Sequence, residues 1–371
     1  MSHAVAPIRI GFAGCGNVLS AYAPVAESLQ RRGLARITAL CGPRPEAAAA
    51  HGLGHLPFET DYPRFLARTD LDAVVLLTPM PQHAAMASAA LEAGKHVLVE
   101  KPLATDRTEA RRIIDLAHQH RRLLLCAPFT VLSPTFQAVA RRLAQGDLGR
   151  VVSARARYGW AGPDWTDWFY KPGGGALFDL GVYQLTTLTG WLGPVRRVTA
   201  FSGIAIPERS IRGHPTRVEA DDTTHLLLDF GNACLASLFA GFTIQQYQGP
   251  GLELYGTEGT LYLHGDDWDP DGYELWQNRA GCWQRYKETD PAWPWADGLN
   301  HLVDCLLHDT PPRVAPDHAY HVLDVMLSAQ EAARDGRARE VTSIFTPPTT
   351  VTPSGALAEA AHRVHDRTRV E

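Results

Sequence analysis

The stretch Ile8-Arg-Ile-Gly-Phe-Ala-Gly-Cys-Gly-Asn-Val18 decides the fold of the first third of this 371-residue chain. Its apolar beginning has the length and composition of a strand buried on both faces of a parallel sheet. The glycines that follow form a tight turn, after which a helical pattern opens. Such a turn brings backbone amides close to a dinucleotide pyrophosphate, which then lies on the helix N-terminus. The cofactor-binding residues expected here are Gly14, Gly16, Asn17 and Val18.

The same alternation of strand and helix continues to residue 127. Short apolar runs lie at 37–40, 73–77, 96–99 and 123–126, and helical patterns lie near 22–33, 82–93 and 106–120. A Gly-x-Gly turn alone is weak evidence for a cofactor, but a doubly wound parallel sheet around it makes the evidence much stronger. We therefore predict a dinucleotide-binding α/β Rossmann domain over residues 1–127.

The pattern changes in the second part of the chain. After a helical segment near 134–145, alternating apolar and polar residues indicate strands with one solvated face. These strands are expected at 150–158, 195–201, 222–230, 233–241, 251–256 and 259–264, followed by helices near 296–308 and 317–335 and a closing strand at 339–344. Consecutive strands without helices between them imply an antiparallel sheet. We predict an α+β domain over 128–345 and a C-terminal tail over 346–371.

Composition excludes several classes of protein. The net charge of −5, with arginines scattered along the chain, gives no electrostatic footprint for nucleic acid. No apolar run approaches the roughly 20 residues of a membrane-spanning helix, and the N-terminus lacks the pattern of a secretion signal. The six cysteines show no Cys-x-x-Cys spacing, and the paired histidines lack partners at ligand spacing. We expect a cytoplasmic protein with reduced thiols, no metal, and no nucleic-acid or membrane partner.

A second stretch, Ala93-Gly-Lys-His-Val-Leu-Val-Glu-Lys-Pro102, is an apolar strand that ends in an ionisable pair. Ligands of parallel sheets bind where the strands end. Pro102 needs no ladder donor and restricts the backbone of Lys101, so the ammonium is presented from a defined position. Only four of the 35 basic residues are lysines, and only lysine loses its proton at an accessible pH. Lys101 is either a surface residue of the loop or, as we favour, a catalytic group.

The segment from Gly173 to Tyr183 predicts a glycine-rich loop that enters a helix. Asp179 and Tyr183 are four residues apart, which places both on one face of an α-helix. The pair is either structural or catalytic. A tyrosine with its ordinary pKa near 10 is a poor base at neutral pH, and a neighbouring lysine cation lowers that pKa.

The residues after the second strand bear on the choice of cofactor. NAD-selective sites usually place Asp or Glu there to bind the ribose hydroxyls, whereas this chain reads Cys41-Gly-Pro-Arg44. Arg44 either pairs with the 2′-phosphate of NADP or is solvated while the backbone recognises the ribose. We expect NAD(P), with a preference for NADP.

Four segments resemble the family of glucose-fructose oxidoreductases, inositol dehydrogenases and their relatives, called Gfo/Idh/MocA. These segments are 14–17, Thr78-Pro79 with His83, 93–102 and 173–181, and the order of elements extends the resemblance over roughly 8–345. The resemblance implies a nucleotide domain followed by an open-faced sheet that often mediates dimers or tetramers. It also implies hydride transfer between nicotinamide and a sugar or polyol carbon.

The resemblance also implies roles for individual residues. Lys101 would orient the reacting oxygen and shift the pKa of the acid/base, and Asp179 would position substrate hydroxyls. The residues implied at the nicotinamide end are Thr78, Pro79, His83, Glu100 and Lys101. Inositol dehydrogenase-like members carry His where this chain has Tyr183, so the chain resembles the Tyr-containing branch, and inositol is not favoured as substrate.

The connection over 159–175 is rich in aromatic residues: Trp160, Trp165, Trp168, Phe169 and Tyr170. Long connections are often functional. Trp165 and Trp168 are candidates for stacking on a sugar ring, and Asp164, Asp167 and Lys171 for binding its hydroxyls; alternatively, the rings cover the domain junction.

Three functions follow from these residues. The first is an NAD(P)-dependent oxidoreductase of a sugar, glycoside or cyclic polyol, acting as a homodimer or homotetramer. The second is a redox-assisted glycosidase that oxidises a hydroxyl transiently and consumes no net cofactor. The third is a non-catalytic regulator that binds cofactor and sugar, against which the joint presence of Lys101, Asp179 and Tyr183 speaks.

Overall fold

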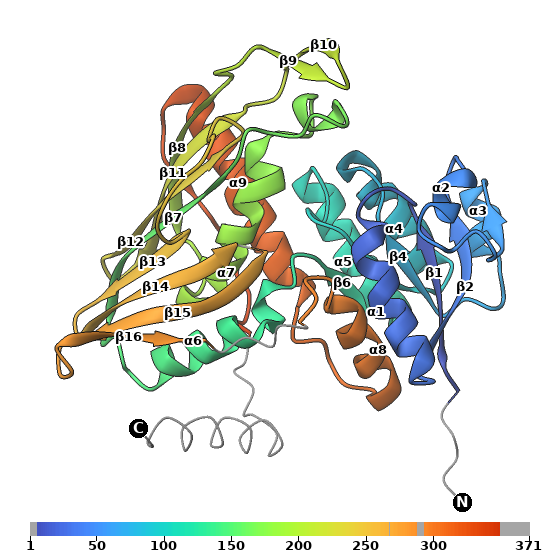
Figure 1. Ribbon diagram of the computed structural model, residues 1–371, viewed down its shortest axis with the longest axis horizontal. Coiled ribbons are helices and arrows are strands. Elements are labelled where there is room, and N and C mark those ends of the chain that lie inside the picture. Colours follow the sequence, from blue (N-terminus) through green and yellow to red (C-terminus); the bar gives the residue numbers. More distant parts are fainter. Residues whose placement is uncertain (1–5, 267, 288–292, 349–371) are drawn as a thin grey trace, which may run out of the picture.

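The computed structural model describes residues 6–266, 268–287 and 293–348. Its first domain is a six-stranded parallel sheet with helices on both faces (Figure 1). The strands are β1 (Ile8–Ala13), β2 (Ala35–Cys41), β3 (Phe58–Glu59), β4 (Ala73–Leu76), β5 (His96–Val99) and β6 (Leu124–Cys126). They lie in the order β3-β2-β1-β4-β5-β6, which reverses direction beside β1 and creates the crevice where dinucleotides bind. The predicted Rossmann fold is confirmed.

The helices of this domain are α1 (Leu19–Arg31), α2 (Glu46–Ala49), α3 (Tyr62–Leu66), α4 (His83–Glu92) and α5 (Arg107–His120). α5 begins where the Asp106 carboxylate accepts hydrogen bonds from the amides of Thr108 and Glu109. α1 has no such side-chain cap, so no capping side chain accepts hydrogen bonds from the first backbone amides of this helix. The sequence did not predict α2, α3 or the two-residue β3, because elements this short show no period.

The second domain contains a nine-stranded sheet in the order β16-β15-β14-β13-β7-β12-β11-β8-β17. Its strands are β7 (Val151–Gly159), β8 (Arg197–Gly203), β11 (Thr223–Gly231), β12 (Cys234–Gly241), β13 (Leu252–Gly256), β14 (Gly259–Asp266), β15 (Asp269–Gln277), β16 (Cys282–Tyr286) and β17 (Arg339–Glu340). Only the pairing of β7 with β12 is parallel, so the predicted mostly antiparallel sheet is confirmed.

Three details of this domain differ from the prediction. The strands β15 and β16 and a separate hairpin, β9 (Glu208–Ile211) with β10 (His214–Arg217), were not expected. The closing strand is only two residues long; after it, the Val341 amide donates to the Arg196 backbone oxygen and Ser343 lies beside the His321 ring. The tail beyond residue 348 lies outside the described residues.

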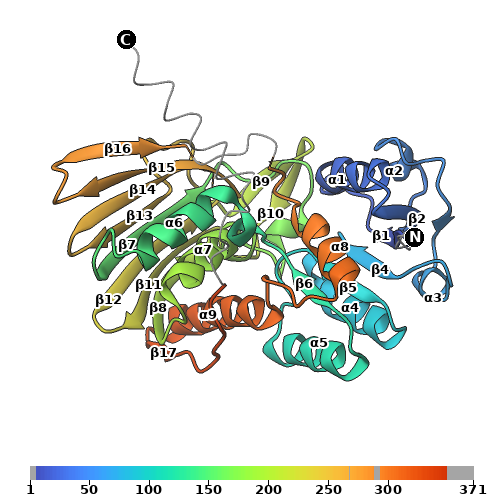
Figure 2. The same cartoon turned by 90° about the horizontal axis from the view of Figure 1, so that it is seen from below.

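One face of the nine-stranded sheet is covered by α6 (Pro134–Ala144), α7 (Val182–Leu192) and α9 (Pro316–Asp335), as Figure 2 shows from below. Among the described residues, no helix covers the other face. Along β11, Leu226 and Leu228 are buried towards the helices, whereas Leu227 points outward with 61% of its surface exposed. Phe201 on the neighbouring β8 is 80% exposed. The sheet is therefore open-faced and carries apolar side chains on its outer surface.

One helix near the end of the chain returns to the first domain. α8 (Gly298–His308) packs against α1 and the Rossmann sheet (Figure 1). Leu299 and Leu302 belong to the same buried cluster as Ile10 and Phe12 of β1. The range 128–345, which we assigned to the second domain, thus contributes a helix to the first.

Within the described ranges, no helix is long and apolar enough to cross a membrane.

Candidate active site

The glycine turn after β1 has two different glycines. Gly14 has φ of +100°, and a Cβ there would lie 2.6 Å from the backbone of Leu77 at the end of β4. Gly14 is therefore required for the turn itself. A Cβ on Gly16 would meet no atom within 4 Å, so the space in front of this residue is open.

The residues of this turn fit a dinucleotide. Within the described part of the chain, the backbone amides of Gly16, Asn17 and Val18 donate no hydrogen bond. They lie just before the uncapped N-terminus of α1. Beside them, the Thr78 Oγ1 is buried without a hydrogen-bond partner, and the Thr78 amide lies 2.9 Å from the position of a Cβ on Gly14. An open anion-binding helix end next to an unsatisfied buried hydroxyl is what a phosphate-bearing cofactor would complete. Pro79 follows Thr78 as an exposed residue.

The end of β2 carries the residues that bear on cofactor choice. Arg44 is exposed just before α2 and forms no ion pair among the described residues. The unpredicted β3 adds a carboxylate nearby, because the Gly42 amide donates to the Glu59 backbone carbonyl. The Glu59 side chain lies 3.8 Å from the Arg68 guanidinium. The sequence missed this acid since it lies 18 residues beyond Cys41 and reaches the site only through strand pairing.

Lys101, Asp179 and Tyr183 meet at the carboxyl end of β5. The Lys101 Nζ donates to the Asp179 Oδ1 at 2.7 Å and to the Asp179 backbone oxygen at 2.8 Å, and it lies 5.0 Å from the centroid of the Tyr183 ring. The side chains of Lys101 and Asp179 are only 11% and 13% exposed. The geometry thus joins a shielded ammonium, a carboxylate and a phenol that are far apart in the sequence.

The helical segment that carries Asp179 is not the regular α-helix we expected. Residues Leu177–Gly181 form a π-helical turn that continues into α7, where Tyr183 lies. The four-residue spacing therefore does not describe an ordinary α-helical face here. π-turns inside helices are frequent at functional sites. In this structure the carboxylate and the backbone carbonyl of Asp179 both face the same ammonium.

The glycine loop before this turn spans the two domains. A Cβ on Gly173 would lie 3.5 Å from Pro81 of the first domain, and one on Gly174 would lie 2.5 Å from the Phe169 backbone oxygen. The Ala176 amide donates to the Asp221 backbone oxygen, which fixes the loop to the second domain. The loop therefore holds the Asp179 turn against the carboxyl edge of the Rossmann sheet.

His83 and Glu100 lie below the surface of the site. His83 is 1% exposed, and its Nδ1 and Nε2 lie 2.8 Å from the backbone oxygens of Pro102 and Thr78. Burial lowers the pKa of this imidazole. A neutral imidazole can donate to only one of these two oxygens. His83 therefore lies buried between the turns after β4 and β5, with both ring nitrogens against the backbone. Glu100, also buried, accepts hydrogen bonds from the Tyr22 hydroxyl and the Lys101 amide.

The aromatic connection packs largely on itself. Trp160 stacks on Trp165 at 5.6 Å between centroids, Trp168 stacks on Phe169 at 3.7 Å, and Phe242 receives the edges of several of these rings. The Lys171 Nζ donates to the Glu219 carboxylate at 2.7 Å. The arrangement agrees with a cluster that covers the junction. Stacking of Trp165 and Trp168 on a substrate stays a prediction.

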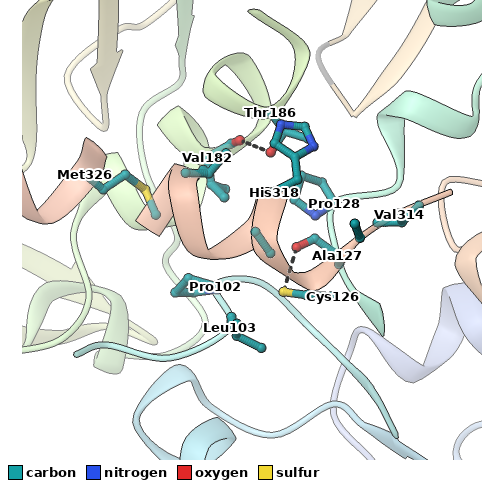
Figure 3. Close-up of a pocket in the computed structure, with 13 residues that line it drawn as sticks. Pro102, Leu103, Cys126, Ala127, Pro128, Val182, Thr186, Val314, His318 and Met326 are labelled. Carbon is teal, nitrogen blue, oxygen red and sulfur yellow. Dashed lines mark hydrogen bonds between the residues drawn. The ribbon is translucent and has the colours of Figure 1, made fainter. Parts of the chain in front are cut away.

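A small cavity behind the Lys101-Pro102 turn is lined mainly by apolar groups (Figure 3). Pro102 and Leu103 face Val182 of α7 and Met326 of α9 across it, and His318 lies at its edge. This lining offers few hydrogen-bonding groups for a carbohydrate, so we place the substrate on the Lys101 side of the turn.

Among the described residues, no cluster of three His, Cys, Asp or Glu side chains is arranged to hold a metal ion.

Comparisons with known proteins agree with this site. Residues 8–127 match the oxidoreductase family with an NAD-binding Rossmann fold, and residues 136–262 match the GFO/IDH/MocA C-terminal domain. The fold and site thus define a two-domain oxidoreductase with an NAD-binding Rossmann domain. The chain belongs to the GFO/IDH/MocA family.

Two relatives and one solved structure illustrate the likeness. A dTDP-3,4-didehydro-2,6-dideoxy-alpha-D-glucose 3-reductase of Actinomadura kijaniata is 38% identical over 192 residues, which are 50% of this chain and 57% of that relative. A levoglucosan dehydrogenase of Pseudarthrobacter phenanthrenivorans is 26% identical over 295 residues, 71% and 74% of the two chains. A structure of levoglucosan dehydrogenase with NADH and levoglucosan has a TM-score of 0.80 and 20% identity, covers 90% of this chain and 99% of its own, and shares the fold.

The two glycines of the turn give a prediction about cofactor binding. Gly16→Leu is expected to weaken dinucleotide binding at least about tenfold with little change in thermal stability, because the side chain would enter open space where we place the pyrophosphate. Gly14→Ala is the matched comparison, and it should lower stability through its clash with Leu77. Calorimetric titration with NAD and NADP measures the first effect, and an unchanged affinity in Gly16→Leu would show that the pyrophosphate lies elsewhere.

Proposed function

We propose that the protein transfers a hydride between the nicotinamide of NAD(P) and a hydroxyl-bearing carbon of a sugar, glycoside or cyclic polyol. The observation that carries this proposal is the contact of the Lys101 ammonium with Asp179 and the Tyr183 ring at the carboxyl edge of the Rossmann sheet. The names of two relatives, a reductase of a dTDP-sugar and a levoglucosan dehydrogenase, support a carbohydrate substrate.

The bound nicotinamide would supply the hydride acceptor or donor, and the residues of this chain would handle the proton. Tyr183 acts as general acid/base, exchanging the proton of the reacting hydroxyl. Lys101 orients the reacting oxygen, and its positive charge favours the ionised phenol. Asp179 holds the ammonium and positions a neighbouring hydroxyl. The low exposure of this pair strengthens these electrostatic interactions, because little water screens them.

The proposal is tested with a panel of sugars, glycosides, cyclic polyols and nucleotide-linked sugars. Nicotinamide absorbance reports net oxidation or reduction, and chromatography reports cleavage of the glycosides. Net absorbance change without cleavage supports a dehydrogenase or reductase. Cleavage without net absorbance change favours the redox-assisted glycosidase, and binding without either favours the regulator.

Cofactor preference gives a second prediction. Arg44 is exposed and forms no ion pair within the described residues, so it is available for a 2′-phosphate, and we propose that NADP binds at least as well as NAD. Arg44→Ala should weaken NADP binding about tenfold and leave NAD unchanged. The matched variant Arg36→Ala removes another exposed arginine of the same domain, from the start of β2 and thus from the end opposite Arg44, and should alter neither affinity. A strong preference of the parent protein for NAD would contradict the proposal and direct attention to Glu59.

Assembly and location complete the proposal. We infer that the protein forms a homodimer or homotetramer through the open face of the sheet, where Phe201, Leu227 and Leu235 are 80%, 61% and 54% exposed. Apolar side chains gathered on one open face are typical of an association surface. Light scattering of the purified protein measures the assembly state. We infer a cytoplasmic location, because six cysteines without a Cys-x-x-Cys spacing are typical of reduced thiols.

A further inference from the structure

A buried tyrosine connects the helix of the cofactor turn with the end of β5. Tyr22 of α1 has no exposed surface, and its hydroxyl donates to the Glu100 Oε1 at 2.7 Å. The other carboxylate oxygen, Oε2, accepts from the Lys101 backbone amide at 3.1 Å. The rings of Trp295 and Tyr22 form a T-shaped pair with centroids 5.9 Å apart. One carboxylate thus joins α1 to the backbone of the catalytic lysine.

The surroundings make the Tyr22 hydroxyl important to this carboxylate. Glu100 is 6% exposed, and Tyr22 and Lys101 provide its two donors among the described residues. The other ionisable groups near it have partners of their own. The His83 nitrogens face backbone oxygens, and the Lys101 ammonium binds Asp179. The buried Cys126 thiol donates to the Ala127 backbone oxygen at 3.0 Å and lies 3.9 Å from the Glu100 backbone oxygen.

We propose that Tyr22 is a positioning residue of the active site. Its hydroxyl holds the Glu100 carboxylate in one orientation, and Glu100 in turn fixes the backbone from which Lys101 reaches Asp179 and Tyr183. A buried polar group needs its hydrogen-bond partners within the protein, because no water replaces them. The kinetic part of this inference rests on the proposed function, whereas the position of Lys101 in the folded protein does not.

Removal of the hydroxyl has a defined consequence. In Tyr22→Phe, Glu100 loses one of its two described donors in a site closed to water. The carboxylate is then free to turn away from the Lys101 amide, and the ammonium loses its fixed origin. Turnover is expected to fall on the order of 10- to 100-fold, the effect of a hydrogen bond to a charged group. KM should change less, because Lys101, Asp179 and Tyr183 are all retained.

The experiment compares Tyr22→Phe with Tyr62→Phe. Tyr62 is a partly buried tyrosine of the same domain whose hydroxyl donates to the Met86 backbone oxygen at 2.9 Å, away from Glu100. Three readouts are made: kcat and KM, the distance between the Lys101 Nζ and the Asp179 Oδ1 in crystal structures of the variants, and NAD affinity by calorimetry. Tyr62→Phe should match the parent in all three. Glu100→Gln alone should lower kcat, and Tyr22→Phe should add little to that loss, because both changes act through the same carboxylate.

The outcomes separate this inference from the proposed function. Loss of the contact between Lys101 and Asp179 in the crystal structure of Tyr22→Phe, with NAD affinity within about threefold of the parent, supports the inference even if no substrate has been found. A contact that stays as in the parent, or losses of turnover that add up in the double variant Tyr22→Phe/Glu100→Gln, overturns the inference and leaves Tyr22 a packing residue. If Tyr22→Phe does not fold, Glu100→Gln decides: parental turnover in that variant overturns the inference.

Discussion

Tyr183→Phe is expected to lower kcat on the order of 10²–10⁴-fold on a confirmed substrate while cofactor affinity stays nearly unchanged. The variant keeps the ring that packs edge-on against Tyr158 and lies 5.0 Å from the Lys101 ammonium, and loses only the hydroxyl. General acid/base groups typically contribute a factor of that size. Initial rates at saturating cofactor, with a parallel calorimetric titration, measure both quantities.

Lys101→Ala should lose as much turnover or more, because it removes the hydrogen-bond donor and the charge that makes the phenol an effective base. The Asp179 carboxylate would also lose its only described cationic partner. The double variant should be little slower than Lys101→Ala, since residues that act as one unit cannot each be removed twice. Lys287→Ala, which removes an exposed lysine paired with Asp271, is the control and should keep parental rates.

Near-parental turnover in Tyr183→Phe would contradict the assignment of the acid/base. Lys101 itself, or a residue of the connection over 159–175, would then be the better candidate for proton transfer. Additive losses in the double variant would show that the two side chains act independently. Either result would leave the family membership of the chain unaffected.

Local patterns were sufficient to predict the Rossmann domain and the position of Lys101. β1, β4 and β5 are apolar runs bounded by turns, and the glycine turn marks the start of α1. What local patterns cannot show is long-range packing. β3 consists of two residues and exists because it pairs with β2, and α8 joins the first domain because its leucines fit beside α1.

The sequence predicted the ionisable groups of the candidate site, but not the turn and the buried tyrosine that hold them in place. Lys101 and Asp179 stand in recognisable motifs, but the π-helical turn that aims Asp179 at the lysine has no sequence period of its own. Tyr22 was missed because an aromatic residue on the buried face of a helix is usually core. Its position six residues after Gly16, on the helix that begins at the cofactor turn, was the available signal.

Acidification is expected to destabilise the protein strongly below about pH 6. Burial lowers the pKa of His318 to about 3 and that of His301 and His321 to about 4. The hydrogen bonds agree with neutral rings, because the amides of Arg313 and Val195 donate to the Nε2 atoms of His301 and His321. All three histidines are at most 7% exposed, and they hold α8 and α9 to their surroundings.

The sign follows from proton binding. The unfolded chain binds protons at histidines near pH 6.5 while the folded rings stay neutral to about pH 4, so the stabilisation is complete above pH 6.5 and is lost as pH falls. Each ring costs the folded state roughly 3 kcal/mol as pH falls from 6.5 to the folded pKa near 4. Three such groups are comparable with the whole stability of a typical domain, about 5–15 kcal/mol. Each contributes a slope of about 1.4 kcal/mol per pH unit within this window.

Urea unfolding between pH 7.5 and 5 measures the free energy of unfolding and its slope. His321→Gln should reduce the slope by about one proton, because the amide side chain keeps an acceptor for the Val195 amide and a donor for Ser343 but does not titrate. His118→Gln, on the exposed side of α5, is the matched variant and should leave the slope as it is in the parent. A free energy of unfolding that stays constant from pH 7.5 to 5 would show that these rings are protonated, or reached by water, in the folded protein.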